Sequence, residues 1–202
     1  MPLFDTPLTF LALIALGAYL LGSIPFGLVV AKAMGLPDPR TIGSKNIGAT
    51  NVLRTGSKPA ALATVLLDGA KGLIAVLIAR ALAGEDAAQI AGLAAFLGHI
   101  FSVFLGFKGG KGVATFLGVL IGLAPLVGAI ACAVWLVTCV ATRYSSLSAI
   151  VASGMSPIVA LLAGKGAMSV LLIVIAALLI WKHRENIARL RAGTESKVGA
   201  KS

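Results

Sequence analysis

Long apolar stretches separated by short polar connections constrain this chain more than any other feature. The stretches cover residues 8–34, 60–83, 87–105, 113–141, 147–163 and 167–181. A helix of about 20 apolar residues is long enough to span a bilayer, and several stretches reach that length. Charged residues make up only 12% of the chain, about half of the roughly 25% typical of soluble domains. The sequence therefore predicts an all-α polytopic integral membrane protein and excludes an ordinary soluble globule.

The remaining charge is strongly basic. Seventeen Lys and Arg residues stand against seven Asp and Glu residues, which gives a formal net charge of +10. This balance would favour a nucleic-acid partner in a soluble protein, but in membrane proteins Lys and Arg collect in cytoplasmic connections. The cations gather in residues 35–58, after Phe107 and after Trp181, whereas the connection at 84–86 is acidic. We therefore expect an N-terminus outside, a cytoplasmic C-terminus and no nucleic-acid partner.

Glycine and proline refine this topology. The connection after Phe107 and the basic tail are both expected inside, so an even number of crossings must separate them, although three apolar stretches intervene. The stretch 113–141 contains Gly122 and Pro125, and because proline interrupts helical hydrogen bonds, we expect two shorter helices that return to the same side. A single kinked spanning helix with the tail outside is the alternative. The expected architecture is five crossings built from about seven helical segments, in one domain over residues 1–202.

Two ionisable residues, Asp68 and Lys71, lie three positions apart inside an apolar stretch. Such residues are costly at membrane depth and are usually paired or functional. At this helical spacing the two side chains can neutralise each other, and we interpret them as a structural ion pair or loop anchor. Ser23 and Pro25 are expected to break the first stretch near the site. No Cys/His spacing typical of a metal site is present, so no metal is expected.

Three polar segments carry the residue types that bind phosphate. Residues 40–56 combine glycines, asparagines, hydroxyls and three cations, which suits a backbone that curls its N–H groups around an anion. Residues 98–115 place a glycine loop with two lysines before an expected helix, whose N-terminus attracts anions. In residues 181–195, His183 and Asn186 share one helix face. The plainer alternatives are turn-rich basic loops for the first two segments and an amphipathic tail on anionic lipid for the third.

Taken in order, these segments resemble the bacterial PlsY family of acyl-phosphate:glycerol-3-phosphate acyltransferases. The matching motifs are Gly-Ser-Ile-Pro-Phe-Gly at 22–27, Gly-Ser-Lys-Asn-Ile-Gly-Ala-Thr-Asn at 43–51, Gly-His at 98–99, Phe-Lys-Gly-Gly-Lys-Gly-Val-Ala-Thr at 107–115, His-Arg-Glu-Asn-Ile-Ala-Arg-Leu at 183–190 and Gly-Thr-Glu at 193–195. Two departures are visible: Lys45 stands where the family usually has glycine, and Ser102 stands where proline is common.

The resemblance implies transfer of a fatty acyl group from acyl phosphate to the sn-1 hydroxyl of glycerol 3-phosphate. The products are lysophosphatidic acid and phosphate, in the first step of phospholipid synthesis. No coenzyme A, cofactor or metal is implied. Because an acyl phosphate is already activated, the protein mainly has to position the hydroxyl and neutralise phosphate charge. The acyl chain is expected in a membrane-facing groove between helices.

The resemblance also implies a location and partners. It places the protein in the bacterial inner membrane, surrounded by lipid, with its active site facing the cytoplasm and a functional link to the enzyme that makes acyl phosphate. A small transporter of phosphate-bearing solutes is the alternative, since broken helices and helix-end anion sites also occur in transporters. A structural membrane adaptor would leave the lysine–glycine loop unexplained.

Residue roles follow from the resemblance position by position. Arg54 and Lys111 are expected to hold phosphate charge. Ser44, His183 and Asn186 are expected to orient the acyl phosphate and the attacking hydroxyl, and the proton acceptor, His183 or a substrate phosphate, stays open. The residues expected to bind substrate or to brace these loops are Arg40, Asn46, Asn51, His99, Lys108, Gly109, Gly110, Gly112 and Glu195.

Overall fold

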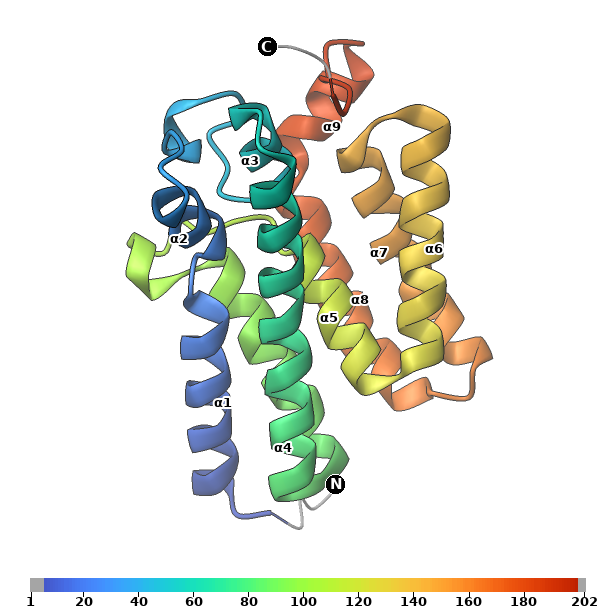
Figure 1. Cartoon of the computed structure of the whole chain (residues 1–202). Coiled ribbons are helices and arrows are strands. Elements are labelled where there is room, and N and C mark those ends of the chain that lie inside the picture. Colours follow the sequence, from blue (N-terminus) through green and yellow to red (C-terminus); the bar gives the residue numbers. More distant parts are fainter. Residues whose placement is uncertain (1–5, 200–202) are drawn as a thin grey trace.

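Proline and glycine divide the apolar stretches into the helices of this protein. The computed structural model describes residues 6–199, and within that range the regular elements are helices, with no β-strand (Figure 1). The all-α class predicted from the sequence is confirmed. The elements are α1 (Leu8–Ser23), α2 (Phe26–Ala33), α3 (Ala49–Val52), α4 (Lys58–Ile100), α5 (Val113–Leu123), α6 (Pro125–Thr142), α7 (Ser145–Leu162), α8 (Gly166–Lys182) and α9 (Arg184–Arg191), with 3-10 turns at Pro39–Thr41, Leu53–Thr55 and Val103–Leu105.

Helix α4 is a hairpin of two arms. Its 43 residues would extend about 65 Å as one straight helix, roughly twice the thickness of a bilayer core. At Ala83 and Gly84 the backbone leaves the helical conformation, with φ +77° at Gly84, and the chain turns back on itself (Figure 1). Arg80 braces this turn, because its Nε donates to Glu85 at 2.9 Å and its Nη1 donates to the carbonyl of Gly122 at 2.6 Å. The turn is thereby tied to the corner between α5 and α6.

The stretch 113–141 folds as two helices, as its glycine and proline predict. The backbone at Ala124 is extended (φ −149°, ψ 94°), and Pro125 begins α6, where its missing N–H costs nothing. Figure 1 shows α5 and α6 running in opposite directions, so that α6 ends beside the polar loops. There the carbonyl of Arg143 accepts a hydrogen bond from the N–H of Val198 at 2.7 Å. The chain therefore returns to the end of the bundle at which α5 begins, and the alternative of a single kinked spanning helix is excluded.

The first apolar stretch also breaks where predicted, between α1 and α2. Ser23 ends α1 and Pro25 precedes α2. The carbonyl of Ile24, left free by the break, accepts a hydrogen bond from Lys71 Nζ at 2.8 Å. The same ammonium lies 2.8 Å from Asp68 Oδ1, and both side chains are buried. The ion pair predicted from the spacing is confirmed, and it anchors the break between the two helices.

Glycines let the helices approach closely. A Cβ atom on Gly22 would lie 2.1 Å from the carbonyl oxygen of Ala95, at the contact between α1 and the second arm of α4. A Cβ atom on Gly118 would lie 1.9 Å from the carbonyl oxygen of Gly69, at the contact between α5 and the first arm. Close backbone contact through small residues is a general basis of helix association in membranes. The glycines of the apolar stretches therefore set the spacing of the bundle.

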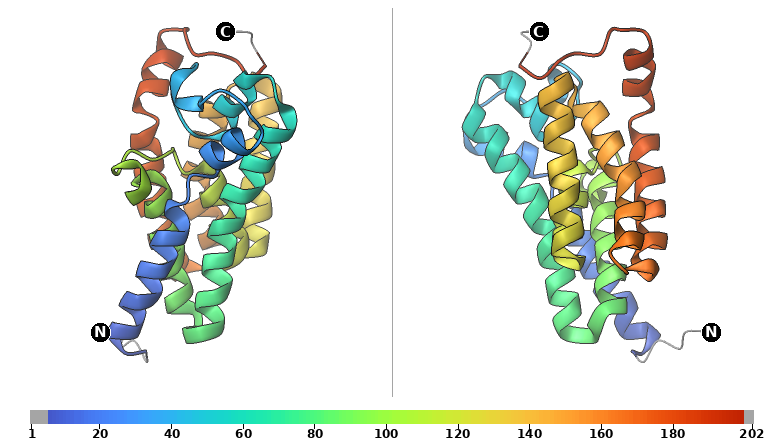
Figure 2. Two further views of the ribbon diagram at one scale, coloured as in Figure 1. Left: turned by 60° about the vertical axis from the view of Figure 1, so that its left-hand side comes forward. Right: turned by 90° about the vertical axis from the view of Figure 1, so that its right-hand side faces the viewer.

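Four segments are long and apolar enough to cross a membrane: Leu8–Ala33, Lys58–Leu105, Pro125–Thr142 and Ser145–Leu162. Helices α8 and α9 are bent by 60° at their junction and would make a fifth if they form one span. Short helices such as α3 and α9 lie in polar segments, so apolarity does not reveal them, and the described part of the chain has more than the seven or so segments expected. Figures 1 and 2 show these short helices gathered at the end opposite the start of α1.

Candidate active site

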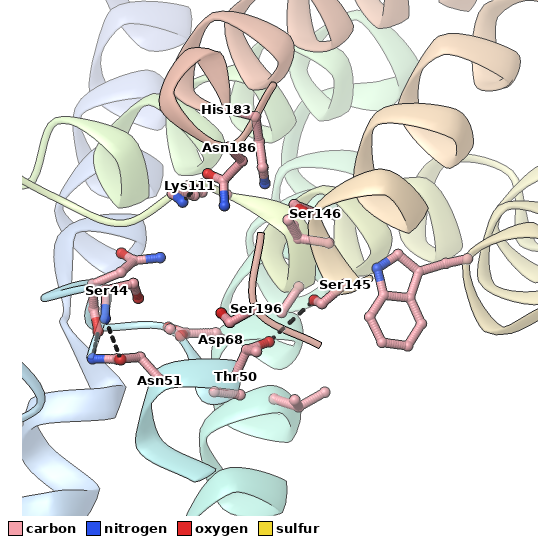
Figure 3. A pocket seen from close by; sticks show the side chains of 18 of the residues that line it. Ser44, Thr50, Asn51, Asp68, Lys111, Ser145, Ser146, His183, Asn186 and Ser196 are labelled. Carbon is pink, nitrogen blue, oxygen red and sulfur yellow. Dashed lines mark hydrogen bonds between the residues drawn. The ribbon is translucent and has the colours of Figure 1, made fainter. Parts of the chain in front are cut away.

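A cavity of about 270 Å³ lies where the polar segments meet. Figure 3 shows side chains entering it from the loop before α4, the loop before α5, the α8–α9 bend and the start of α7. The fold thus assembles one site from segments that are far apart in the sequence. The residues predicted for the site that line this cavity are Ser44, Asn46, Asn51, Arg54, His99, Lys111, Gly112, His183, Asn186 and Glu195.

One buried side chain, that of Asn51, holds the loop before α4. Its Oδ1 accepts the backbone N–H of Ser44 at 3.0 Å and the Nη1 of Arg54 at 3.0 Å. Gly43 precedes Ser44 with φ +48°, and a Cβ atom there would lie 2.6 Å from Arg54 Cδ. Glycine and asparagine together therefore present the serine and the arginine to the cavity. The two N–H groups on Nδ2 of Asn51 are shared among three backbone carbonyls, those of Pro39 at 2.5 Å, Ile42 at 3.2 Å and Asn46 at 2.8 Å.

The loop before α5 is shaped by glycines packed against His99 and Phe96. A Cβ atom on Gly109 would lie 2.0 Å from the carbonyl oxygen of His99, and one on Gly110 would lie 2.2 Å from Nε2 of the same residue. The N–H of Gly110 donates to the His99 carbonyl at 3.0 Å. Gly112 has φ +88°, and a Cβ atom there would lie 2.3 Å from the Phe96 ring. The glycine pattern is therefore a steric requirement of the loop.

Lys111 and His183 bring a cation and an imidazole to the cavity (Figure 3). Lys111 Nζ donates to Oδ1 of Asn186. His183 lies at the α8–α9 bend, where its Nδ1 is 2.8 Å from the carbonyl oxygen of Leu179. Because a carbonyl oxygen only accepts, Nδ1 carries the hydrogen and Nε2 of the neutral ring is left as an acceptor. A hydroxyl group in the cavity can donate a hydrogen bond to that nitrogen.

The electrostatics of the cavity favour an anion. Burial is the main cause that lowers the pKa of Lys111 from 10.5 to about 8; the positive charges of Arg189 and Arg54 act in the same direction, and the carboxylates of Glu195 and Glu185 act against them. Removal of water disfavours the charged ammonium, and so do neighbouring cations. A bound anion would relieve both effects. Arg side chains also hold phosphate oxygens in pairs, so this end of the cavity suits a phosphate group.

The segment after α9 crosses the cavity and is fixed by Glu195. Its Oε1 accepts hydrogen bonds from Asn186 Nδ2 at 2.6 Å and Ser146 Oγ at 2.7 Å. Its Oε2 accepts one from Arg189 Nε at 2.7 Å. Burial raises the pKa of Glu195, but these hydrogen bonds outweigh it and the net pKa is lowered. Glu195 therefore stays a carboxylate that braces Asn186 against α7 and α9.

Four of the predicted residues do not line the cavity. Arg40 is exposed and paired with Asp38 at 2.6 Å, and Lys108 is exposed. Gly109 and Gly110 are packed against His99 behind the cavity wall. The two glycines position the loop, whereas the two cations lie on the surface beside it.

Sequence reasoning missed the contributions of α6 and α7, and it missed Ser196 next to Glu195 in the last segment. Thr50 Oγ1 and Ser145 Oγ lie 3.1 Å apart across the cavity (Figure 3), and Ser196 Oγ accepts Arg54 Nη2 at 2.5 Å. A serine pair next to Arg143 between two apolar stretches was the available signal for the start of α7. The lining residues that were not predicted are Gly48, Ala49, Thr50, Val65, Asp68, Val113, Ala114, Leu117, Trp135, Ser145, Ser146, Arg189 and Ser196.

The lining of the cavity includes both cations and apolar side chains. The cations are Arg54, Lys111 and Arg189, and the apolar side chains include Val65, Leu117 and Trp135. Val65, on the first arm of α4, is 45% exposed. Within residues 6–199, no three His, Cys, Asp or Glu side chains are grouped so as to hold a metal ion. Fold and cavity define an integral membrane protein with a site suited to a phosphate-bearing amphiphile.

Comparison with known proteins gives the family. The family model described as glycerol-3-phosphate acyltransferase matches residues 12–193. The glycerol-3-phosphate acyltransferase of Ruegeria sp. (strain TM1040) is 59% identical over 201 residues, which cover 100% of both chains. That of Agrobacterium fabrum (strain C58 / ATCC 33970) is 56% identical over 191 residues, 95% of this chain and 93% of the relative. The chain therefore belongs to the glycerol-3-phosphate acyltransferase family, as its motifs predict.

Two solved structures agree with this assignment. Both are crystal structures of PlsY (YgiH), an integral membrane glycerol 3-phosphate acyltransferase. Its glycerol 3-phosphate form matches with a TM-score of 0.89 and 44% identity, over 94% of this chain and 96% of that one. Its lysophosphatidic acid form matches with a TM-score of 0.87 and 43% identity, over 93% and 95%. The polytopic membrane fold is thus shared with a protein whose solved forms carry a phosphate-bearing substrate and a lipid.

Proposed function

We propose that this protein transfers a fatty acyl group from acyl phosphate to the sn-1 hydroxyl of glycerol 3-phosphate. The observation that carries the proposal is that the cations Arg54 and Lys111 and the apolar side chains of Leu117 and Trp135 line the same cavity. The cations suit a phosphate group, and the apolar side chains suit an acyl chain. The products would be lysophosphatidic acid and inorganic phosphate, and the step would open phospholipid synthesis.

The proposed roles follow the position of each group in the cavity. Arg54 and Lys111 hold phosphate oxygens, since both are cations at the cavity wall. Ser44 and Asn186 orient the two substrates by hydrogen bonds. Nε2 of His183 accepts a hydrogen bond from the attacking hydroxyl, because Nδ1 is already committed to the Leu179 carbonyl. Orientation of this kind supplies a large part of the rate when the donor is already activated.

The chemistry needs no covalent enzyme intermediate. The glycerol hydroxyl oxygen attacks the acyl carbon, a new C–O ester bond forms, and the bond between the acyl carbon and the phosphate oxygen breaks. The leaving phosphate takes the electron pair of that bond, and the cations stabilise its charge. The hydroxyl proton passes to the leaving phosphate or to His183, and the effect of His183→Gln on the pH profile distinguishes the two.

The location follows from the same proposal. The polar end of the bundle faces the cytoplasm, where a bacterium supplies glycerol 3-phosphate, and the apolar stretches cross the inner membrane. The start of α1 then lies outside, as the basic connections predict. The whole chain acts as one membrane-embedded domain, and the enzyme that makes acyl phosphate is its functional partner.

The test is transfer by purified protein in lipid, with labelled glycerol 3-phosphate. We compare acyl phosphate, acyl coenzyme A and acyl carrier protein as donors, and we expect equal amounts of 1-acyl lysophosphatidic acid and phosphate from acyl phosphate alone. Lys111→Ala should lower this activity at least about tenfold while the protein stays folded, because a phosphate ligand is lost. Lys165→Ala, in the exposed connection between α7 and α8, is the matched control and should leave the rate unchanged. Folded wild-type protein without product would refute the proposal.

A further inference from the structure

The bend between α8 and α9 presents its residues to two different sides. His183 and Asn186 line the cavity. Trp181 and Arg184 do not line it, and both are exposed. Arg191 is also exposed, and because seven residues make almost two full helical turns, it lies on the same face of α9 as Arg184. The outward side of the bend therefore takes no part in the site described above.

Two cations share one aromatic ring on this outward side. Arg184 Cζ lies 4.9 Å from the centroid of the Trp181 ring, and Lys182 Nζ lies 5.8 Å from it. Lys182 Nζ also lies 5.1 Å from the centroid of the Phe101 ring and donates to the carbonyl of Ile100 at 2.9 Å. Trp181 is 48% exposed. The cluster is thus built by packing, and it stays open to the surroundings of the bundle.

No carboxylate balances these cations in the part of the chain that the structure describes. The ion pairs there include none of Lys182, Arg184 and Arg191. Glu185, the acidic residue of α9, lies four positions before Arg189 and therefore on the flank toward that residue. Cations this close together repel one another. The cluster therefore favours an anionic group from outside the chain.

The helix that leads to the cluster indicates the kind of anion. Helix α8 has no charged residue before its last position. Its exposed apolar residues Val170, Ile173 and Val174 form a stripe that continues to Trp181. From position 170 to 181 the helix rises about 17 Å, close to the roughly 15 Å of one hydrocarbon leaflet, and tryptophan is typical of the membrane–water interface. A ligand that covers stripe and cluster has an apolar chain and an anionic headgroup.

We propose that the outward side of the α8–α9 bend binds an anionic phospholipid. Its phosphodiester contacts Lys182 and Arg184, its headgroup extends toward Arg191, and one acyl chain lies along the stripe of α8. Basic residues at a membrane surface attract anionic lipid in this way. The lipid lies outside the cavity, so the inference goes beyond the proposed function and does not depend on it.

The test measures which lipid lies next to Trp181. Because the chain has two tryptophans, Trp135→Phe leaves Trp181 as the single indole. The protein is placed in mixed bilayers, and its emission is quenched by spin-labelled phosphatidylglycerol or by phosphatidylcholine with the same labelled chain. We expect phosphatidylglycerol to bind at least about fivefold more tightly, since each cation near the surface adds attraction. High salt should reduce this preference by screening. Equal quenching by the two lipids would overturn the proposal.

Two variants with the same change in net charge separate this site from the charge of the whole protein. Arg184→Gln combined with Arg191→Gln removes two cations of the outward face and should lower the preference at least about fivefold. Lys32→Gln combined with Lys58→Gln removes the same charge from exposed positions at the end of α2 and the start of α4, and it should keep the preference. An equal loss in both variants, or no loss in the first, would refute the site.

A further measurement needs no change at Trp135. Native mass spectrometry of the wild-type protein, released from bilayers with equal amounts of the two lipids, should show retained phosphatidylglycerol in excess of phosphatidylcholine. The Arg184→Gln, Arg191→Gln variant should lose that excess. Equal retention of the two lipids by the wild-type protein would contradict the proposal even if Trp135→Phe fails to fold.

Discussion

The two glycine-rich loops of the site look alike in sequence but are held by different forces. The loop before α4 is organised by the side chain of Asn51, which bonds five groups on that loop. The loop before α5 is organised by missing side chains, since Gly109, Gly110 and Gly112 lie against His99 and Phe96. The conformation of the first loop therefore depends on the hydrogen bonds of one side chain, and that of the second depends on glycines that leave no Cβ atom to clash with His99 and Phe96. Substitutions in the two loops should therefore disturb the site in different ways.

The largest effect is expected at Gly109. A Cβ atom there would lie 2.0 Å from the backbone carbonyl oxygen of His99, which cannot swing aside like a side chain. Gly109→Ala should displace the loop and Lys111 with it, and a displacement of about 1 Å costs roughly a hundredfold in rate. The measurement is the transfer rate of folded protein. Gly154→Ala in α7 is the control, because its backbone is helical and no atom lies within 4 Å of its Cβ position, and a similar loss in both variants would contradict the steric account.

The next effect is expected at Asn51. Asn51→Ala removes a buried amide and leaves the Ser44 N–H and several carbonyls without their partner. Each buried group that loses its partner costs about 1–3 kcal/mol, so the free energy of unfolding should fall by about 3 kcal/mol. Thermal unfolding in detergent measures the change. Asn46→Ala provides the comparison, because it keeps the backbone carbonyl that Asn51 uses. An equal loss of stability in Asn46→Ala would contradict the stabilising role of the Asn51 side chain.

The two loops should also respond differently to pH. The pKa of Lys111 is about 8, so the ammonium is lost as pH rises through 8, whereas an arginine stays charged. The Kd for glycerol 3-phosphate should rise about tenfold per pH unit above 8, and calorimetry from pH 7 to 10 measures it. Lys111→Arg should remove this dependence, and a flat wild-type profile would refute the role of Lys111.

A loss of folded protein would not explain this weaker binding at high pH, because the stability contributed by Lys111 changes with pH in the opposite direction. The folded pKa of Lys111 lies below its ordinary value of 10.5, so the unfolded chain binds more protons between pH 8 and 10.5. Stability from this group therefore rises with pH across that window, while affinity for the anion falls.

The smallest effect is expected at Lys45. Its φ of +55° is a conformation that glycine adopts without cost, whereas other residues lose about 1–2 kcal/mol. Lys45→Gly should therefore stabilise the loop by up to about 1 kcal/mol after the entropy cost of glycine, which differential scanning calorimetry resolves as a small rise in Tm. Lys45→Ala keeps the strain and should leave Tm unchanged, so a rise in both variants would show that the side chain and not the backbone matters.

The two departures from the family pattern now have local explanations. The positive φ of Lys45 accounts for the usual glycine at that position. Ser102 has φ −62°, which proline also adopts, and its hydroxyl donates to the carbonyl of Ser23 at 2.6 Å. The serine therefore links the end of α4 to the α1–α2 break, a hydrogen bond that proline would not make.

Local signals predicted much of the fold. Hydropathy marked the spanning segments, Pro25 and Pro125 marked helix breaks, and the spacing of Asp68 and Lys71 marked an ion pair, because each signal acts between near neighbours in the chain. The same reasoning named most of the cations that line the cavity. It did not reveal that Arg40 pairs with Asp38 at the surface, since composition does not say which way a side chain turns.

The sequence by itself determined that this chain enters a membrane, where its helices break and which polar groups are available for phosphate. Only the tertiary structure decided which of those groups meet. Trp135 and Ser146 reach the cavity because α6 and α7 fold back beside it, and Glu195 reaches Asn186 because the last segment crosses over α9. Those positions depend on helix spacing, such as the contact of Gly118 with Gly69, and helix spacing is set by packing between distant parts of the chain.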